Sequence, residues 1–196
     1  MNVMREIMRK IRKKDIIYIF IMIVVLYIIL FFSLELYNKN LKAPFEYSGD
    51  VVGVFSEIKN MTLGNGLFYN PNLAAPFGSN QALANKGYLL HYLFIYFIGV
   101  FTKDAALILN LFYLLSFGLV AFTAFISFRL IGFKNSICTV MAIVYSILPY
   151  HFFRYEQHIY LAAYYTVPLS CVVLIWFFTG KFENGKSIIK KAKFIN

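Results

Sequence analysis

Long apolar runs separated by polar links dominate this sequence. The first, residues 16–34, is almost entirely Ile, Val, Leu, Phe and Tyr, and its length suits a hydrocarbon core about 30 Å thick. Four more apolar runs occupy residues 87–102, 105–130, 136–149 and 159–179. Continuous runs favour membrane helices, because a helix satisfies its own backbone hydrogen bonds in lipid, whereas the strands of a membrane barrel alternate apolar and polar positions.

A polar segment, residues 35–86, separates the first run from the others. Loops longer than about 15 residues are usually functional or disordered, and this one keeps aromatic residues that a disordered segment lacks. Apolar residues recur within it at helical spacing, at Val51, Val54, Phe55, Ile58 and Met61. This pattern predicts an amphipathic surface helix over residues 50–63, ended by the turn Gly64-Asn65-Gly66.

Composition supports a lipid environment. Hydrophobic residues make up 60% of the chain and charged residues 14%, against about 25% charge in a soluble domain. The net charge of +10 comes largely from basic clusters near the two ends. Such clusters are typical of cytoplasmic flanks of membrane helices, and no aromatic-interleaved basic domain indicates a nucleic-acid partner.

The distribution of charge also favours a topology. Five crossings from a cytoplasmic N-terminus would place Arg129, Lys134 and the lysine-rich tail outside, against the positive-inside tendency. Four crossings place every cluster correctly if the short run 87–102 enters the membrane only partly or lies along its surface. We therefore predict an all-α integral membrane protein, a helical bundle of four or five membrane segments with a long structured external loop. Its expected parts are a basic cytoplasmic N-terminus (1–15), membrane helix 1 (16–34), the external loop (35–86), the helical membrane bundle (87–179) and a basic cytoplasmic tail (180–196).

Asp50 is the first candidate for chemistry, because it is a carboxylate in the external loop. A carboxylate at this place could remove the proton of an acceptor hydroxyl, or hold a divalent cation against a phosphate. Its position before the predicted helix also fits a helix N-cap, and both roles stay open. Glu57 follows two helical turns later and could share a face with Asp50 as a paired acid, although simple solvation explains it as well.

A second group of titratable residues follows the run 136–149. Arg154 and His158 are four residues apart and would share a face of a helix. Arginine binds phosphate as a fork, and histidine donates to phosphate or moves protons, although such residues also anchor helices at the headgroup level. His91, in the run 87–102, is either a functional ionisable group in the membrane or a neutral histidine hydrogen-bonded between helices.

Several short motifs together resemble the N-terminal part of GT-C-type polytopic membrane glycosyltransferases, in particular bacterial relatives that build cell-surface glycans. The matching motifs are Ser48-Gly49-Asp50, Asn70-Pro71-Asn72, Pro76-Phe77-Gly78, residues 149–161 and Val167-Pro168-Leu169. The resemblance implies transfer of a sugar from a polyprenyl-phosphate donor to a cell-envelope acceptor, at the outer face of the bacterial cytoplasmic membrane. It implies that Asp50 acts as a base or metal-associated acid and that Arg154 and His158 face the lipid phosphate.

This chain departs from that family in its length. The family typically has eight or more membrane helices, whereas this chain stops soon after its last apolar run. The resemblance therefore leaves open a truncated enzyme, a half completed by a second membrane subunit, or a non-catalytic membrane subunit. A polytopic transporter or flippase for lipid-linked sugars is the alternative function, although transporters usually place titratable groups at the bilayer midplane.

Overall fold

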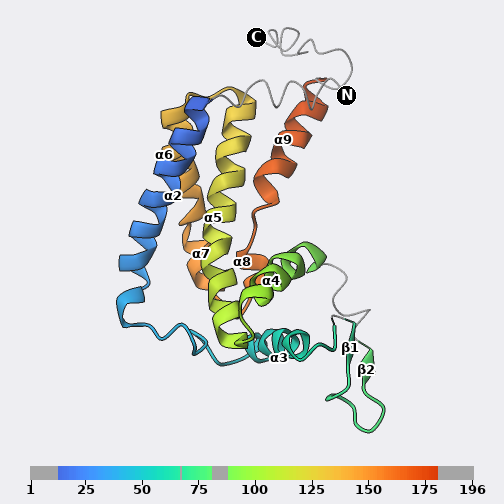
Figure 1. The fold of residues 1–196 in the computed structure, drawn as a ribbon. Helices are drawn as coiled ribbons and strands as arrows, with labels where there is room; N and C mark the ends of the chain where they lie inside the picture. Colours follow the sequence, from blue (N-terminus) through green and yellow to red (C-terminus); the bar gives the residue numbers. More distant parts are fainter. Residues whose placement is uncertain (1–12, 67, 81–87, 181–196) are drawn as a thin grey trace. The chain divides into compact units, whose positions relative to one another are not determined.

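The computed structural model describes residues 13–66, 68–80 and 88–180. Helices dominate these residues, and their order along the chain can be followed in Figure 1. The basic N-terminal residues 1–12 and the tail residues 181–196, for which cytoplasmic ends were predicted, lie outside the described part. The helices are α2 (Lys13–Ser33), a 3-10 turn η1 (Leu36–Asn38), α3 (Asp50–Thr62), α4 (Leu89–Phe101), α5 (Ala105–Ile131), α6 (Asn135–Ser146), α7 (Pro149–Arg154), α8 (Ile159–Ala162) and α9 (Val167–Phe178).

Among the described residues, three stretches are long and apolar enough to cross a membrane: 14–33, 105–131 and 135–154, the last made of α6 and α7. The predicted all-α membrane class is therefore confirmed in its coarse form, but four or five spans are not found among the described residues. α4 and α9 are apolar but shorter. At about 1.5 Å per residue, the 13 residues of α4 cover roughly 20 Å, less than a hydrocarbon core of about 30 Å.

The predicted run 159–179 is not one helix, and this is a correction. It divides into α8 and α9, separated by residues 163–166. Pro168 lies in the first turn of α9, where its missing N–H costs nothing, but in a continuous helix its ring would clash with the carbonyl of the residue four positions earlier, Tyr164. The proline therefore starts a new helix instead of continuing the previous one.

The chain forms two compact units. Unit 1 combines residues 1–28, 118–147 and 165–196. In its described part a small core forms from Leu130, Val172 and Trp176, against which Ile126 packs. Asp15 is buried, and it accepts hydrogen bonds from Arg129 Nε at 3.0 Å and Asn135 Nδ2 at 2.5 Å. The pairing satisfies a carboxylate that would otherwise be costly in an apolar setting.

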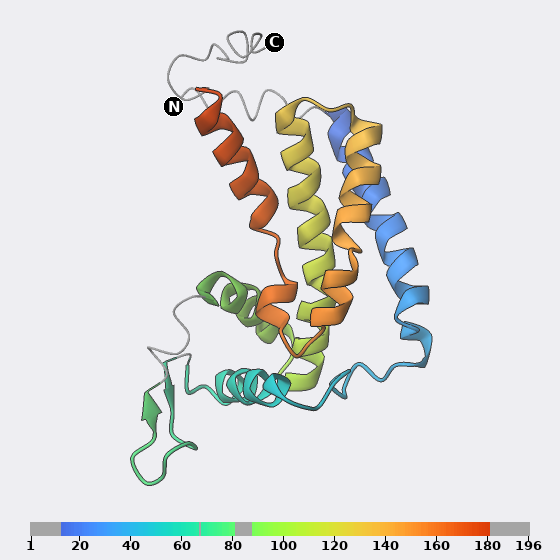
Figure 2. The ribbon, with the colours of Figure 1, turned by 180° about the vertical axis from the view of Figure 1, so that it is seen from behind.

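Unit 2 combines residues 29–117 and 148–164. Strands β1 (Tyr69–Asn70) and β2 (Ser79–Asn80) form a short antiparallel hairpin after α3, which Figure 2 shows from behind. Buried Asn60 of α3 donates from Nδ2 to the carbonyl oxygens of Gly66 and Tyr69 at 3.2 and 2.9 Å, which fixes the base of the hairpin to the helix. The Asn-Pro-Asn and Pro-Phe-Gly motifs belong to this hairpin.

The segment before α3 is fixed to α5 by a single amide. Asn110 is fully buried, and its Nδ2 donates to the carbonyl oxygens of Leu41 and Ala43 at 2.8 and 2.7 Å. The backbone N–H of Phe45 donates back to Asn110 Oδ1 at 3.3 Å. Asn110 thus supplies hydrogen-bond partners that this irregular segment does not find in its own backbone, and it holds the chain that leads to Asp50.

Candidate functional site

Helix α3 presents one polar and one apolar face. Val51, Val54 and Ile58 are buried, whereas Asp50, Gly53 and Glu57 line a neighbouring cavity. The helix begins after Gly49, whose φ of 55° and ψ of −133° lie in a region that residues with a Cβ rarely adopt. The glycine turns the chain sharply enough for the helix to start at Asp50, and the heptad spacing then brings both carboxylates to one wall.

Asp50 is not the helix N-cap, which corrects one of the two predicted roles. Gly49 holds the cap position and no side chain caps the helix. Asp50 lies in the first helical turn, where its charge interacts favourably with the helix dipole. Its Oδ2 lies 3.4 Å from Nδ1 of His158, with 75% of the aspartate side chain and 38% of the histidine side chain exposed. The carboxylate is therefore accessible and already beside a proton-carrying partner.

Glu57 is not a simply solvated residue. Its Oε2 accepts hydrogen bonds from the hydroxyls of Tyr92 and Tyr160, the latter at 3.0 Å. The two hydroxyls lie 2.9 Å apart, so that three oxygens form a closed cluster. Burial and the nearby charge of Glu57 raise the pKa of Tyr160, which keeps this hydroxyl protonated as a donor.

Asp50, Glu57, His158 and Tyr160 line one cavity of about 540 Å³. Its volume falls within the range of about 300–1,000 Å³ that is usual for small-ligand sites. All of its walls belong to unit 2: α3 on one side, and Tyr88 with residues 157–161 on the other. The rings of Tyr88 and Tyr160 stack with centroids 4.3 Å apart at 16°, which adds a flat aromatic element to a lining that also offers carboxylates, an amide and an imidazole.

A second layer of hydrogen bonds fixes the chain segments that carry Asp50 and His158. Fully buried Glu156 accepts a hydrogen bond from the backbone N–H of Glu46 through Oε2 at 3.0 Å. Gln157 donates to Ser48 Oγ at 3.1 Å, and Ser48 donates to Glu46. Burial is the main cause that raises the pKa of Glu156 to about 7, and backbone N–H groups of Glu46 and Phe45 act in the opposite direction.

Arg154 does not join His158 on a shared helical face. α7 ends at Arg154, and Tyr155 follows with φ 46°, ψ −153°, so that His158 instead precedes α8. The guanidinium carbon of Arg154 lies 5.2 Å from the centroid of the Tyr150 ring, and Arg154 is not among the residues that line the cavity. His158 is therefore the residue of this predicted pair that reaches the cavity.

His91 also lies outside the cavity lining. It packs among aromatic rings, with ring centroids 5.7 Å from Tyr160 and 5.9 Å from Phe112. It therefore supports Tyr160 from behind. Within the described residues, no group of three or more His, Cys, Asp or Glu side chains is placed to hold a metal ion.

Sequence reasoning missed Tyr92, Glu156 and Tyr160. Each acts through a partner that is distant in sequence: Glu57 is 35 residues from Tyr92 and 103 from Tyr160, and Glu46 is 110 from Glu156. Tyr92 and Tyr160 lie in apolar segments, where tyrosine is expected as packing or as an interfacial anchor. No local pattern distinguishes them from the other tyrosines of the chain.

The geometry supports proton transfer at the rim of the cavity. An exposed carboxylate can accept a proton from a bound hydroxyl, and an imidazole beside it can orient that carboxylate or take the proton onward. The partly buried Glu57 cluster can hold further hydroxyl groups through charge-assisted hydrogen bonds. Comparison with protein-family models, with curated proteins and with solved structures finds no match for this chain.

Proposed function

We propose that this chain is a membrane glycosyltransferase-like protein that takes a sugar from a polyprenyl-phosphate donor and transfers it to a cell-envelope acceptor. In this proposal Asp50 removes the proton of the acceptor hydroxyl and His158 orients the carboxylate. The observation that carries the proposal is the contact of 3.4 Å between Asp50 and His158 on the wall of a sugar-sized cavity. The resemblance of the motifs around both residues to GT-C enzymes supports the same assignment.

The composition of the cavity fits a hydroxyl-rich ligand. Carboxylates and amides bind sugar hydroxyls through hydrogen bonds, while aromatic faces cover the apolar C–H side of a ring. Glu57, Gln157 and the stacked pair Tyr88–Tyr160 supply these elements. His158 is the lining side chain that could donate to the phosphate, since Arg154 lies over Tyr150.

The number of crossings supports a site on one side of the membrane. Between Asp50 and His158 the chain passes through two stretches long enough to span, 105–131 and 135–154. Two crossings return the chain to the same side, whereas a third crossing by α4 would separate the two residues. We propose that this side is the outer face of the cytoplasmic membrane, with the N-terminus in the cytoplasm.

The test is a transfer assay on the full chain in proteoliposomes. Radiolabelled polyprenyl-phosphate sugars serve as donors, and sugar transferred to an acceptor is measured for the wild type, Asp50→Asn and Glu35→Gln. Loss of a general base costs about 10²–10⁴-fold in rate, so Asp50→Asn should lose at least about 100-fold. Glu35 is exposed and is not among the residues that line the cavity, so Glu35→Gln should retain activity. Full transfer activity of Asp50→Asn would refute the proposal. If the wild type transferred no sugar, and Asp50→Asn lost translocation of the lipid-linked sugar across the membrane, the protein would instead be a transporter.

A further inference from the structure

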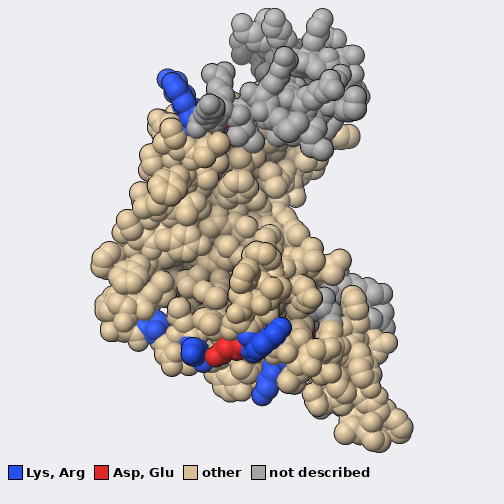
Figure 3. Space-filling view, viewed as in Figure 1, with Lys and Arg blue, Asp and Glu red and all other residues tan. Residues whose placement is uncertain are grey.

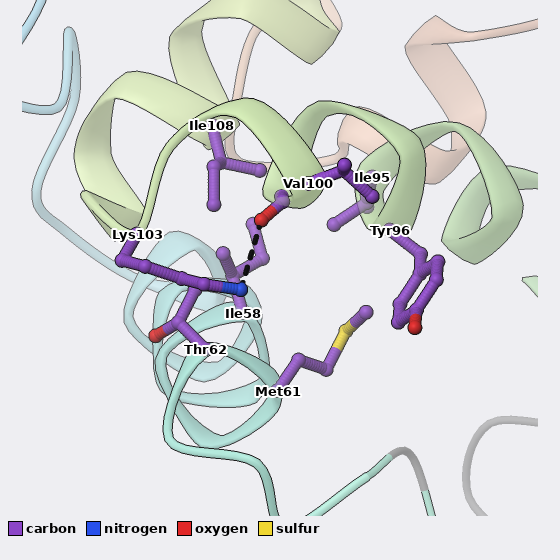
Figure 4. A pocket seen from close by; sticks show the side chains of 9 residues that line it. Ile58, Met61, Thr62, Ile95, Tyr96, Val100, Lys103 and Ile108 are labelled. Atoms are coloured by element: carbon purple, nitrogen blue, oxygen red, sulfur yellow. Dashed lines mark hydrogen bonds between the residues drawn. The ribbon is translucent and has the colours of Figure 1, made fainter.

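A second hollow lies between α3 and α4, apart from the cavity that holds Asp50. Figure 4 shows Ile58 and Met61 of α3 facing Ile95 and Val100 of α4, and Ile108 of α5 also lines the hollow. We call this the α3–α4 groove. It is about 60 Å³ in volume, which corresponds to a few methylene groups and is too narrow for a ring-bearing substrate.

The apolar lining of this groove continues onto the surface of α4. Leu93, Tyr96, Phe97, Val100 and Phe101 are all large and exposed, with exposed fractions from 59% to 76%. α4 is too short to cross the membrane, and three candidate spans lie elsewhere among the described residues. An apolar stripe of this size therefore fits a helix that lies in the membrane interface. The stripe and the groove form one continuous apolar surface.

A cationic group lies at one end of this surface. Lys103 follows α4 directly, lines the groove and is exposed. Its Nζ donates to the carbonyl oxygen of Gly99 at 3.0 Å, drawn as the dashed line in Figure 4, and an ammonium has three donors. Figure 3 shows Lys and Arg side chains, with acidic side chains among them, over the region of α3, on a surface that is otherwise largely uncharged.

We propose that the α3–α4 groove binds an anionic phospholipid of the surrounding bilayer. One acyl chain lies on the accessible side chains of Met61, Tyr96 and Val100 and continues along the exposed stripe of α4, while the lipid phosphate accepts hydrogen bonds from Lys103. The apolar floor matches the chain, and the ammonium at its end matches the charge of the headgroup. This site is independent of the proposed transfer activity, because none of its residues lines the cavity of Asp50.

The test is a lipid titration of the full chain, followed by native mass spectrometry, with phosphatidylglycerol and phosphatidylcholine as probes. A basic residue near an anionic lipid surface contributes about 1 kcal/mol, so the wild type should bind phosphatidylglycerol about fivefold more tightly. Lys103→Gln should remove this preference. Lys59→Gln is the matched control, because Lys59 is an exposed lysine of α3 that does not line the groove, and it should keep the preference.

A second variant tests the groove itself. A side chain at Gly99 would point toward Ile108, whose Cδ1 lies 3.8 Å from the place that the Cβ of an alanine would take, so Gly99→Leu fills the groove while Lys103 is retained. This variant should weaken binding of both lipids. The proposal would be overturned if Lys103→Gln kept the wild-type preference for phosphatidylglycerol, or if Lys59→Gln lost as much of this preference as Lys103→Gln. Unchanged lipid binding in Gly99→Leu would also overturn it. The Asp50→Asn protein should bind lipid normally, which separates this result from the transfer assay.

Discussion

At the scale of single residues, the acidic groups of unit 2 fall into different environments. Asp50 has 75% of its side chain exposed, whereas Glu156 is fully buried. An exposed polar contact such as Asp50–His158 contributes at most about 1 kcal/mol to stability. Replacement of Asp50 therefore tests function without unfolding the protein, while replacement of Glu156 tests how the segment around the cavity is held.

Glu156 should make stability depend on pH. The pKa of Glu156 is about 7 in the folded chain, against an ordinary value of 4.5, so the folded state holds the proton more tightly than the unfolded state. The proton on Glu156 makes its full contribution to the free energy of unfolding below about pH 4.5. This contribution, roughly 3 kcal/mol in all, is lost as the pH rises toward about 7. Thermal unfolding in detergent at a series of pH values measures this loss.

The control for this titration is the neutral amide. Glu156→Gln keeps an oxygen acceptor for the N–H of Glu46 but has no proton to lose, so its unfolding should be less dependent on pH between about 4.5 and 7. Glu35→Gln, at an exposed position, should keep the wild-type dependence. An unchanged pH profile in Glu156→Gln would show that another group is responsible.

Tyr160 should stabilise the fold through its hydroxyl. Tyr160→Phe removes one of the two tyrosine donors to Glu57 and leaves the ring stacked on Tyr88. Hydrogen bonds to charged groups contribute about 1.5–3 kcal/mol, and a loss of this size is expected in chemical denaturation. Tyr88→Phe keeps both donors to Glu57 and should change stability by less than about 0.5 kcal/mol. Equal losses in the two variants would contradict the role of the Glu57 cluster.

At the scale of elements, the apolar patterns carry most of the information. The run 16–34 corresponds to α2, and the amphipathic pattern over 50–63 corresponds to α3, because both depend on periodicity within one segment. The prediction of one helix over 159–179 was wrong, because a hydropathy pattern does not show the effect of Pro168 on the preceding backbone. The N-cap, one of the two roles left open for Asp50, was wrong, because Gly49 with its φ of 55° holds the cap position.

The role of Gly49 at the start of α3 can be tested by comparing two glycines, one with a positive φ and one inside the helix. Gly49→Ala should destabilise by about 1–2 kcal/mol, because φ is 55° there although the Cβ meets no atom within 4 Å. Gly53→Ala, inside α3 and equally free of contacts, should stabilise by about 0.5–1 kcal/mol through higher helix propensity. Denaturation midpoints of both variants give the two signs, and a loss in both would contradict the conformational explanation.

At the scale of the whole molecule, the membrane topology determines which residues can meet. If the chain crosses the membrane at 14–33, 105–131 and 135–154 and α4 does not cross, Ser48 and Gln157 lie on the same side of the membrane. Single cysteines at these positions, in a background without Cys138 and Cys171, should react with a membrane-impermeant maleimide from one side only. The expected result is equal labelling of both from the outside of intact cells. Labelling from opposite sides would show that α4 crosses.

The candidate site was only partly predictable from the sequence. Asp50, Glu57 and His158 were identified because each is a titratable residue in a segment expected outside the membrane, and the structure brings all three to one cavity. Arg154 was expected beside His158 by helical spacing, but the break at Tyr155 separates them. Tyr92, Glu156 and Tyr160 depend on contacts between distant segments, which only the folded chain defines.

The most direct test of the account is a double-mutant cycle on sugar transfer between Asp50 and His158. If the two side chains act as one unit, Asp50→Asn and His158→Gln should each reduce the rate strongly, and the double variant should be hardly slower than the worse single variant. All four proteins should insert and unfold alike, since the exposed pair adds little stability. Two losses that simply multiply in the double variant, or an unchanged rate in either single variant, would contradict the assignment of this cavity as the reactive site.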